Sequence, residues 1–226
     1  MKKVLFTIQE YIDKFLFGRR CCGCQTQGEA ICQNCLEHIP FAEETENYGI
    51  YGLYDYGNPI VSHAIWNLKY KHKGQEIKLL TKKSSVLMSE IISEHLQSSS
   101  QEKITLVPIP QYKRKTETRG FNQSLLIAKW FSKEIPNSKV LNILIKNKDT
   151  IPQSHLSDRK ARQKNIANTM YVKNNYPPAG GKSTIYILVD DVTTTGATFL
   201  EAMRALKSGG AKNILCIALA HGYKRK

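Results

Sequence analysis

Two adjacent carboxylates followed by a threonine- and glycine-rich turn are the residues of this sequence best suited to chemistry. Asp190 and Asp191 come directly after the apolar run 185–189, and the turn 193–198 follows them. In open α/β sheets ligands bind at the carboxyl ends of strands, and a turn that opens a helix offers N–H groups and hydroxyls to a phosphate. Gly196 allows a close approach of the backbone. The carboxylates suit hydroxyl groups or a metal ion, so the pattern predicts a ligand with a phosphate beside a ribose diol.

A second group with metal-binding chemistry lies in residues 21–35, which contain five of the 6 cysteines. Two Cys-x-x-Cys pairs occur there, and each such turn aims two sulfurs at one point. The four thiols are Cys21, Cys24, Cys32 and Cys35. Cys22 could replace Cys21 only with the wrong spacing to Cys24. A disulfide is disfavoured in a reducing cytosol, and a redox site needs one pair, so we predict structural Zn²⁺.

The net charge predicts attraction to phosphates. The chain has 33 Lys+Arg against 19 Asp+Glu, which gives +14. Residues 1–60 hold 5 basic and 8 acidic side chains, whereas residues 61–226 hold 28 and 11. The cysteine module is balanced, so a zinc finger that grips DNA by itself is disfavoured, and the excess belongs to the rest of the chain. Hydrophobic content of 41% excludes wholesale disorder.

Alternating strands and helices must position these residues. Apolar runs predict strands at 48–56, 104–107, 140–145, 185–189 and 214–219, with helices over 60–70, 79–96, 122–131 and 199–207. This order predicts an α/β fold with a mostly parallel sheet flanked by helices. We expect three parts, which are an N-terminal helix over 1–17, a four-cysteine zinc module over 18–40 and the α/β domain over 41–226.

The start of the chain predicts a cytoplasmic protein. Apolar residues recur at three- and four-residue steps from Val4 to Leu16, with polar residues between them. That spacing indicates one apolar face of a helix that docks on the core, and it lacks the uninterrupted apolar segment and small-residue cleavage site of a signal peptide. No apolar run approaches the ~18 residues that a membrane span needs.

The acidic pair and its turn resemble the signature of type I phosphoribosyltransferases. The resemblance implies that Asp190 and Asp191 contact the ribose 2′- and 3′-hydroxyls of phosphoribosyl pyrophosphate and orient the ring. It also implies that the turn holds the 5′-phosphate and that Mg²⁺ accompanies the pyrophosphate. The residues of the turn are Thr193, Thr194, Thr195, Gly196, Ala197 and Thr198.

A four-cysteine module joined to such a domain is similar to the layout of the ComF-type competence family (ComFC). Residues 107–110 and 119–123 look like the first active-site loop of that family, in which we expect Arg114 and Arg119 to bind pyrophosphate. Residues 152–165 fit its mobile basic loop, and 54–56 and 68–70 look like its connector. Glu117 and Thr118 depart from the more arginine-rich family stretch.

This resemblance implies a cytoplasmic protein that handles incoming single-stranded DNA in natural transformation, with phosphoribosyl pyrophosphate as a small ligand and a ComFA-like helicase as a partner. Aromatic residues interleaved with cations at 70–73, 112–115 and 222–226 suit base stacking and backbone contacts. The alternatives are a metabolic phosphoribosyltransferase acting on a nucleobase or amine, and a binding module without chemistry. The sequence leaves catalysis and the acceptor open.

Overall fold

The computed structural model of the chain describes residues 19–42, 49–71, 74–96, 103–149, 165–173 and 184–222. The expected N-terminal helix over 1–17 lies outside these residues. So do most of the expected mobile loop and the basic tail after residue 222. In the part of the chain that is described, no helix is both long enough and apolar enough to cross a membrane.

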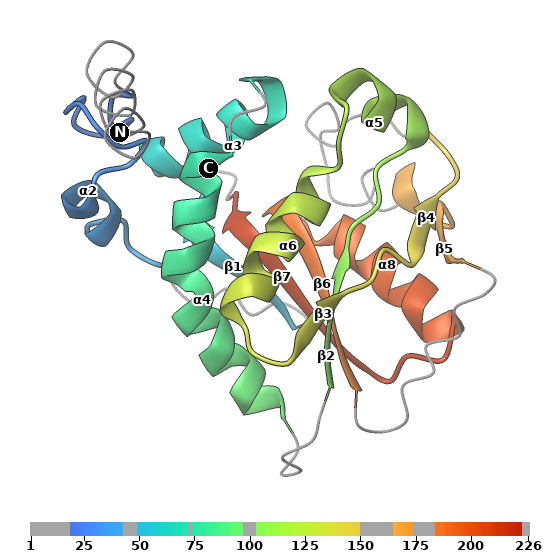
Figure 1. The fold of residues 1–226 in the computed structure, drawn as a ribbon. Coiled ribbons are helices and arrows are strands. Elements are labelled where there is room, and N and C mark those ends of the chain that lie inside the picture. The colour runs from blue at the N-terminus through green and yellow to red at the C-terminus, as the bar shows by residue number, and fades with distance from the viewer. Residues whose placement is uncertain are drawn as a thin grey trace, which may run out of the picture.

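A five-stranded sheet forms the centre of the fold (Figure 1). Its order is β1 (Ile50–Asp55), β7 (Asn213–His221), β6 (Thr184–Thr193), β2 (Lys103–Pro108) and β3 (Ser138–Val140), and all four pairings are parallel. The run 185–189 is buried throughout, as expected for a strand covered on both faces. The predicted α/β fold with a mostly parallel sheet is confirmed.

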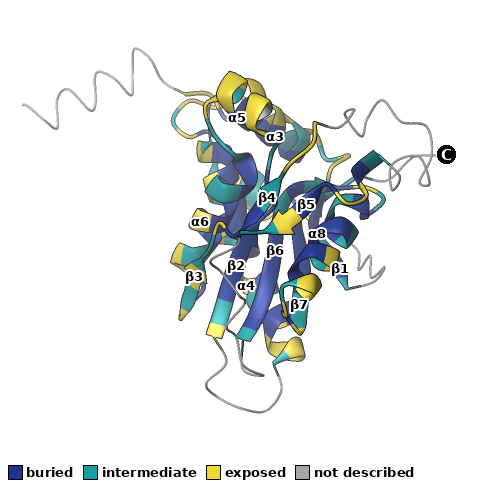
Figure 2. Ribbon diagram, turned by 90° about the vertical axis from the view of Figure 1, so that its right-hand side faces the viewer, coloured by how far each residue is buried: buried dark blue, intermediate teal, exposed yellow. Residues whose placement is uncertain are grey.

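The inner strands β2, β6 and β7 of this sheet are buried along most of their length (Figure 2). Side chains of the sheet alternate between two apolar layers, one on each side of it. Ile187 and Val189 of β6 belong to the layer under α3 (Pro59–Lys71), α4 (Gln75–His95) and α6 (Gln123–Glu134). Leu188 belongs to the opposite layer, beneath α8 (Ala197–Ser208). The cysteine module contributes Ile31 and Ile39 to the first layer. Its short helix α2 (Gln33–Glu37) lies beside α4 (Figure 1).

Two segments differ from the sequence prediction. The run 140–145 is not one strand, because β3 ends at Val140 and the chain then leaves the sheet to form β4 (Leu144–Lys146), which pairs antiparallel with β5 (Met170–Val172). The expected cationic loop is a short helix, α5 (Lys113–Arg119). Gly120 ends α5 in the left-handed conformation that glycine favours, with φ of 79°.

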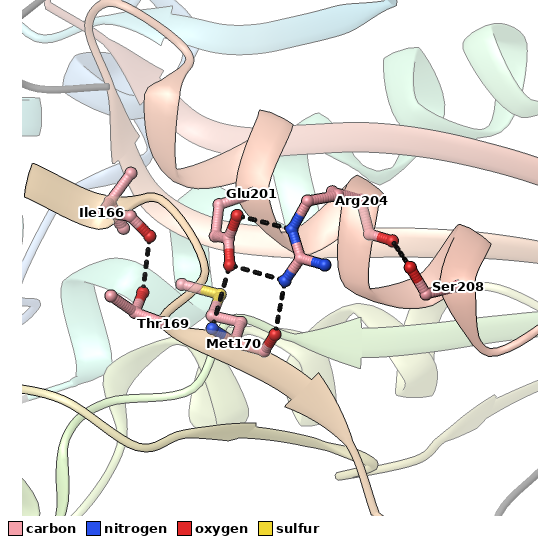
Figure 3. Close-up of polar contacts among 6 residues, drawn as sticks. All are labelled: Ile166, Thr169, Met170, Glu201, Arg204 and Ser208. Atoms are coloured by element: carbon pink, nitrogen blue, oxygen red, sulfur yellow. Dashed lines mark hydrogen bonds and ion pairs between the residues drawn. The ribbon is translucent and has the colours of Figure 1, made fainter. Parts of the chain in front are cut away.

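The β4–β5 pair is anchored on α8 by a side-chain clamp (Figure 3). Glu201 Oε1 accepts from the Met170 N–H at 3.0 Å, and Arg204 Nη2 donates to the Met170 carbonyl at 2.8 Å and to Glu201 Oε1 at 2.9 Å. Burial would raise the pKa of Glu201, but the hydrogen bonds from Arg204 and Met170 outweigh it and lower this pKa. The clamp thus uses an ionised, satisfied carboxylate to fix β5 over the sheet.

Candidate functional site

The two aspartates lie inside β6, because this strand runs four residues beyond the predicted apolar run. Asp190, Val192 and Thr193 continue the parallel pairing with β7, opposite Ala218, Ala220 and His221. The chain then turns through 194–196 and enters α8. Gly196 precedes α8 at φ of 72°, and a Cβ there would lie 2.6 Å from Ile50 Cδ1. Only glycine therefore fits this turn without strain.

The aspartates and the turn line one cavity of about 490 Å³, which we call the acidic-pair cavity. All eight residues predicted to contact the ribose and its phosphate contribute to its wall, together with Tyr56, Lys69, Val192 and Phe199. The structure therefore brings together two carboxylates, a row of hydroxyls and the beginning of a 12-residue helix. This combination suits a ligand that carries both hydroxyl donors and an anionic group.

Side chains from two distant helices hold the aspartates in place. Lys69 Nζ, in the last turn of α3, lies 2.8 Å from Asp191 Oδ2. The Ser124 hydroxyl, in the first turn of α6, donates to Asp190 Oδ1 at 2.8 Å, and the Asp191 N–H donates to the same oxygen at 2.9 Å. The sequence pattern does not assign Lys69 or Ser124 to the site. Lys69 falls only within the connector segment, and nothing local marks either residue.

These contacts shift the pKa values of Asp190 and Lys69. Burial first, and the charge of Asp191 second, raise the pKa of Asp190 to about 7. Burial by itself lowers the pKa of Lys69, but the charge and hydrogen bond of Asp191, with Asp190 beyond it, outweigh burial and raise it. Lys69 therefore stays cationic beside Asp191, whereas Asp190 is held near its point of titration at neutral pH.

Asp190→Asn is expected to raise the melting temperature by about 5–10 °C more at pH 8 than at pH 5. The pKa of Asp190 is raised from 3.8 to about 7 in the folded state, so the native protein holds the proton that the unfolded chain releases. The free energy of unfolding therefore falls as pH rises from about 4 to 7, and the neutral amide removes this loss. Thermal melting between pH 5 and 8 measures the difference. Glu90→Gln, on the exposed side of α4, is the control; identical pH profiles for Asp190→Asn and the wild type would contradict the prediction.

The two arginines expected at the pyrophosphate are not among the described residues that line the acidic-pair cavity. Arg114 lies on α5, where its guanidinium Nη2 is 2.5 Å from Asp149 Oδ2. Arg119 ends α5, and its guanidinium carbon lies 5.8 Å from the centre of the Tyr70 ring. Both positions follow from the helix that replaces the expected loop. Their pyrophosphate role stays a prediction.

The four predicted cysteines converge at one point. Their sulfurs all lie within 4.8 Å of one another, and Cys24 Sγ and Cys32 Sγ are 3.6 Å apart. Zn–S bonds of about 2.3 Å give tetrahedral S–S edges of about 3.8 Å, so the cluster could hold a zinc ion. The Cys32 N–H donates to Cys21 Sγ at 3.3 Å. Hydrogen bonds with the side chain and backbone of Thr26 lower the pKa of Cys24 to about 6, which favours a thiolate.

Exposed aromatic and cationic side chains form a row along the last turns of α3. The ring centres of Trp66 and Tyr70 are 5.7 Å apart. Trp66 is 46% exposed and Tyr70 is 60% exposed. Lys71 Nζ lies 5.5 Å from the Trp66 ring centre, and Arg119, at the end of α5, lies over the Tyr70 ring. We call these four residues the aromatic–cation row. It retains the aromatic residue and first lysine of the predicted 70–73 segment, and residues 72 and 73 lie outside the described part.

Comparison with known proteins extends the similarity to nearly the whole chain. The chain is 29% identical over 202 residues to Competence protein F of Haemophilus influenzae, which covers 88% of this chain and 82% of that protein. It is 24% identical over 216 residues to Competence protein ComFC of Bacillus subtilis, covering 92% and 80%. It is 27% identical over 186 residues to DNA utilization protein YhgH of Escherichia coli K12, covering 82% and 75%. No family model matches the chain.

Proposed function

Taking the chain as a ComF-type protein, which these homologues support, we propose that it handles incoming single-stranded DNA in natural transformation and binds phosphoribosyl pyrophosphate in the acidic-pair cavity. The names of the relatives point to competence and to the use of DNA. One structural observation joins the two activities. Helix α3 places Lys69 in the cavity, and the next two residues, Tyr70 and Lys71, lie in the aromatic–cation row.

The shape and chemistry of the acidic-pair cavity support a phosphoribosyl ligand. The turn 193–198 offers hydroxyls and backbone N–H groups at the start of α8, where the helix dipole favours a phosphate. Asp190 and Asp191 are acceptors for a ribose diol, and Ser124 and Lys69 fix their orientation. Mg²⁺, when bound, would neutralise charge on the pyrophosphate, and its ligands would be substrate oxygens, water and these carboxylates.

In the proposed function the protein binds phosphoribosyl pyrophosphate, and transfer of its phosphoribosyl group is the activity to be tested. If transfer occurs, a nitrogen of the base or amine would bond to C1 of the ribose as pyrophosphate leaves it, and the residues of the cavity would hold the ring and the 5′-phosphate while charge develops. Release of pyrophosphate in the presence of each purine and pyrimidine base, and of amines, separates a metabolic phosphoribosyltransferase from a binding protein. Base-dependent release would favour the metabolic alternative.

The aromatic–cation row supports single-strand binding. Stacked bases need aromatic faces, the phosphates between them need cations, and both requirements are met without sequence selectivity. Trp66 and Tyr70 provide two exposed rings, and Lys71 and Arg119 provide charges beside them. The row differs in this from the charged pair Arg204 and Glu201, whose side chains already bind each other and the backbone of β5 (Figure 3). A ComFA-like helicase would receive or deliver the strand held by the row.

Tyr70→Ala is expected to weaken the binding of a labelled 20-nucleotide single strand about tenfold, because one base loses its stacking partner. Binding is measured by fluorescence anisotropy between 50 and 300 mM salt. The slope against salt should stay the same, since the substitution removes no positive charge. Tyr171→Ala is the matched control, because Tyr171 is 42% exposed on β5, away from the row. Unchanged affinity in a Trp66→Ala, Tyr70→Ala double variant would refute the assignment.

A further inference from the structure

A second cavity, of about 750 Å³, lies between the cysteine module and the α3–α4 pair, and we call it the module cavity. Its wall includes Trp66 and Lys71, which also belong to the aromatic–cation row. Arg19 and Arg20 of the cysteine module also line it. The module has no net charge, but folding brings its two arginines into the wall of the cavity that Lys71 and Trp66 also line.

The wall of the module cavity also contains a buried carboxylate with a free acceptor. Glu76, in the first turn of α4, is 7% exposed, and its Oε1 accepts from Asn67 Nδ2 at 3.0 Å. Glu76 Oε2 has no hydrogen-bond partner among the described residues. This oxygen is itself covered, and a buried acceptor without a donor is unfavourable, so rotation of the carboxylate toward a donor on a bound molecule would be stabilising.

We propose that the module cavity takes up one base of the single strand and prefers a base that offers an exocyclic amino group to Glu76. This inference rests on the proposed binding of single-stranded DNA. The aromatic face of Trp66 would stack on the base, and Arg19, Arg20 and Lys71 would contact the flanking phosphates. A carboxylate oxygen only accepts hydrogen bonds, so it pairs with the N4 amino group of cytosine.

Uracil provides the matched comparison. It carries a carbonyl oxygen where cytosine carries the amino group, and two acceptors that face each other repel. The preference therefore arises from one atom position on the base and one side chain of the protein. The aromatic–cation row supplies affinity without selectivity, and the module cavity adds selectivity to it.

The test measures the affinities of 20-nucleotide oligo(dC) and oligo(dU) for the full chain by anisotropy competition at low salt. The wild type is expected to bind oligo(dC) about fivefold more tightly. Glu76→Gln should bring the two affinities together, because its amide can donate to the uracil carbonyl while its oxygen still accepts from Asn67. Glu90→Gln removes the same charge from an exposed position of α4 and should keep the fivefold preference.

Each result of this experiment decides something. Equal wild-type affinities for the two oligonucleotides overturn the module-cavity proposal and leave single-strand binding standing. This comparison uses the wild type alone, so it does not depend on whether a variant folds. A preference that persists in Glu76→Gln with an unchanged melting temperature also overturns it. No binding of either oligonucleotide at low salt overturns the proposed function and this inference together.

Discussion

Cys35→Ser is expected to abolish zinc binding and to lower the melting temperature of the whole protein by about 10 °C or more. Serine is a poor zinc ligand, and three thiolates do not close a tetrahedral structural site. The loss should reach beyond the module, because Ile31 and Ile39 pack in the same apolar layer as the sheet. Lys83 of α4 also donates to the carbonyl oxygens of Leu36 and Glu37 at 2.7 and 3.0 Å. Zinc content by elemental analysis and thermal melting measure the two effects.

Cys22→Ser is the matched control for this prediction. Cys22 directly follows one of the four clustered cysteines, yet it is not a member of the cluster. Cys22 lines the module cavity, and burial, with the charges of Cys21 and Glu76, raises the pKa of its thiol to about 11. Cys22→Ser should keep one zinc per chain. A wild type without zinc, or loss of zinc in Cys22→Ser equal to that in Cys35→Ser, would show that the ligand set is wrong.

Local patterns predicted the centre of the candidate site. A strand, two carboxylates, a glycine turn and a helix follow one another within about twenty residues, so backbone geometry alone brings them to one edge of the sheet. The two Cys-x-x-Cys pairs are equally local, which is why their clustering could be predicted. In both cases, the residues that meet are close in sequence, and few alternative arrangements satisfy the spacing.

Contacts between distant elements could not be predicted. Ser124 is 66 residues from Asp190, and Lys69 and Asp191 meet only because α3 ends beside β6. In sequence Lys69 is one lysine among many in a basic domain. The pairing also carries physical consequences, since it keeps Lys69 cationic and helps to set the titration of Asp190 near neutrality.

The two errors in the secondary structure have different origins. The apolar run 140–145 has the composition of a strand, but composition does not reveal that β3 ends at Val140, opposite Leu106, and that β4 joins another pair. The resemblance to the first active-site loop of the ComF-type family predicts a loop around Arg114. Its sequence instead forms one short helix that Gly120 ends, and this helix carries Arg119 to Tyr70.

Asp190→Asn with Asp191→Asn is expected to weaken the binding of phosphoribosyl pyrophosphate with Mg²⁺ at least about 100-fold. Each carboxylate should lose a hydrogen bond to a ribose hydroxyl, and hydrogen bonds to charged groups contribute about 1.5–3 kcal/mol each. Amides preserve the shape of the site, which alanine would not, and the amide introduced by Asp190→Asn keeps an oxygen that can accept from Ser124. Isothermal titration calorimetry measures the affinity, and anisotropy on a single strand measures the second activity in the same samples.

Lys69 complicates this double variant, because it loses the partner of its ion pair with Asp191. A partly buried lysine without its carboxylate destabilises a protein, so a triple variant that adds Lys69→Gln restores the charge balance of the site. Glu90→Gln is the control, since Glu90 is exposed on α4 and does not line the acidic-pair cavity. If the triple variant melts like the wild type, binds single strands and no longer binds phosphoribosyl pyrophosphate, its transformation frequency decides the role of the ligand. Normal transformation would make the phosphoribosyl site dispensable for DNA handling, whereas its loss would make ligand binding part of that process. Unchanged ligand affinity in the folded triple variant would remove the aspartates from the proposed site altogether.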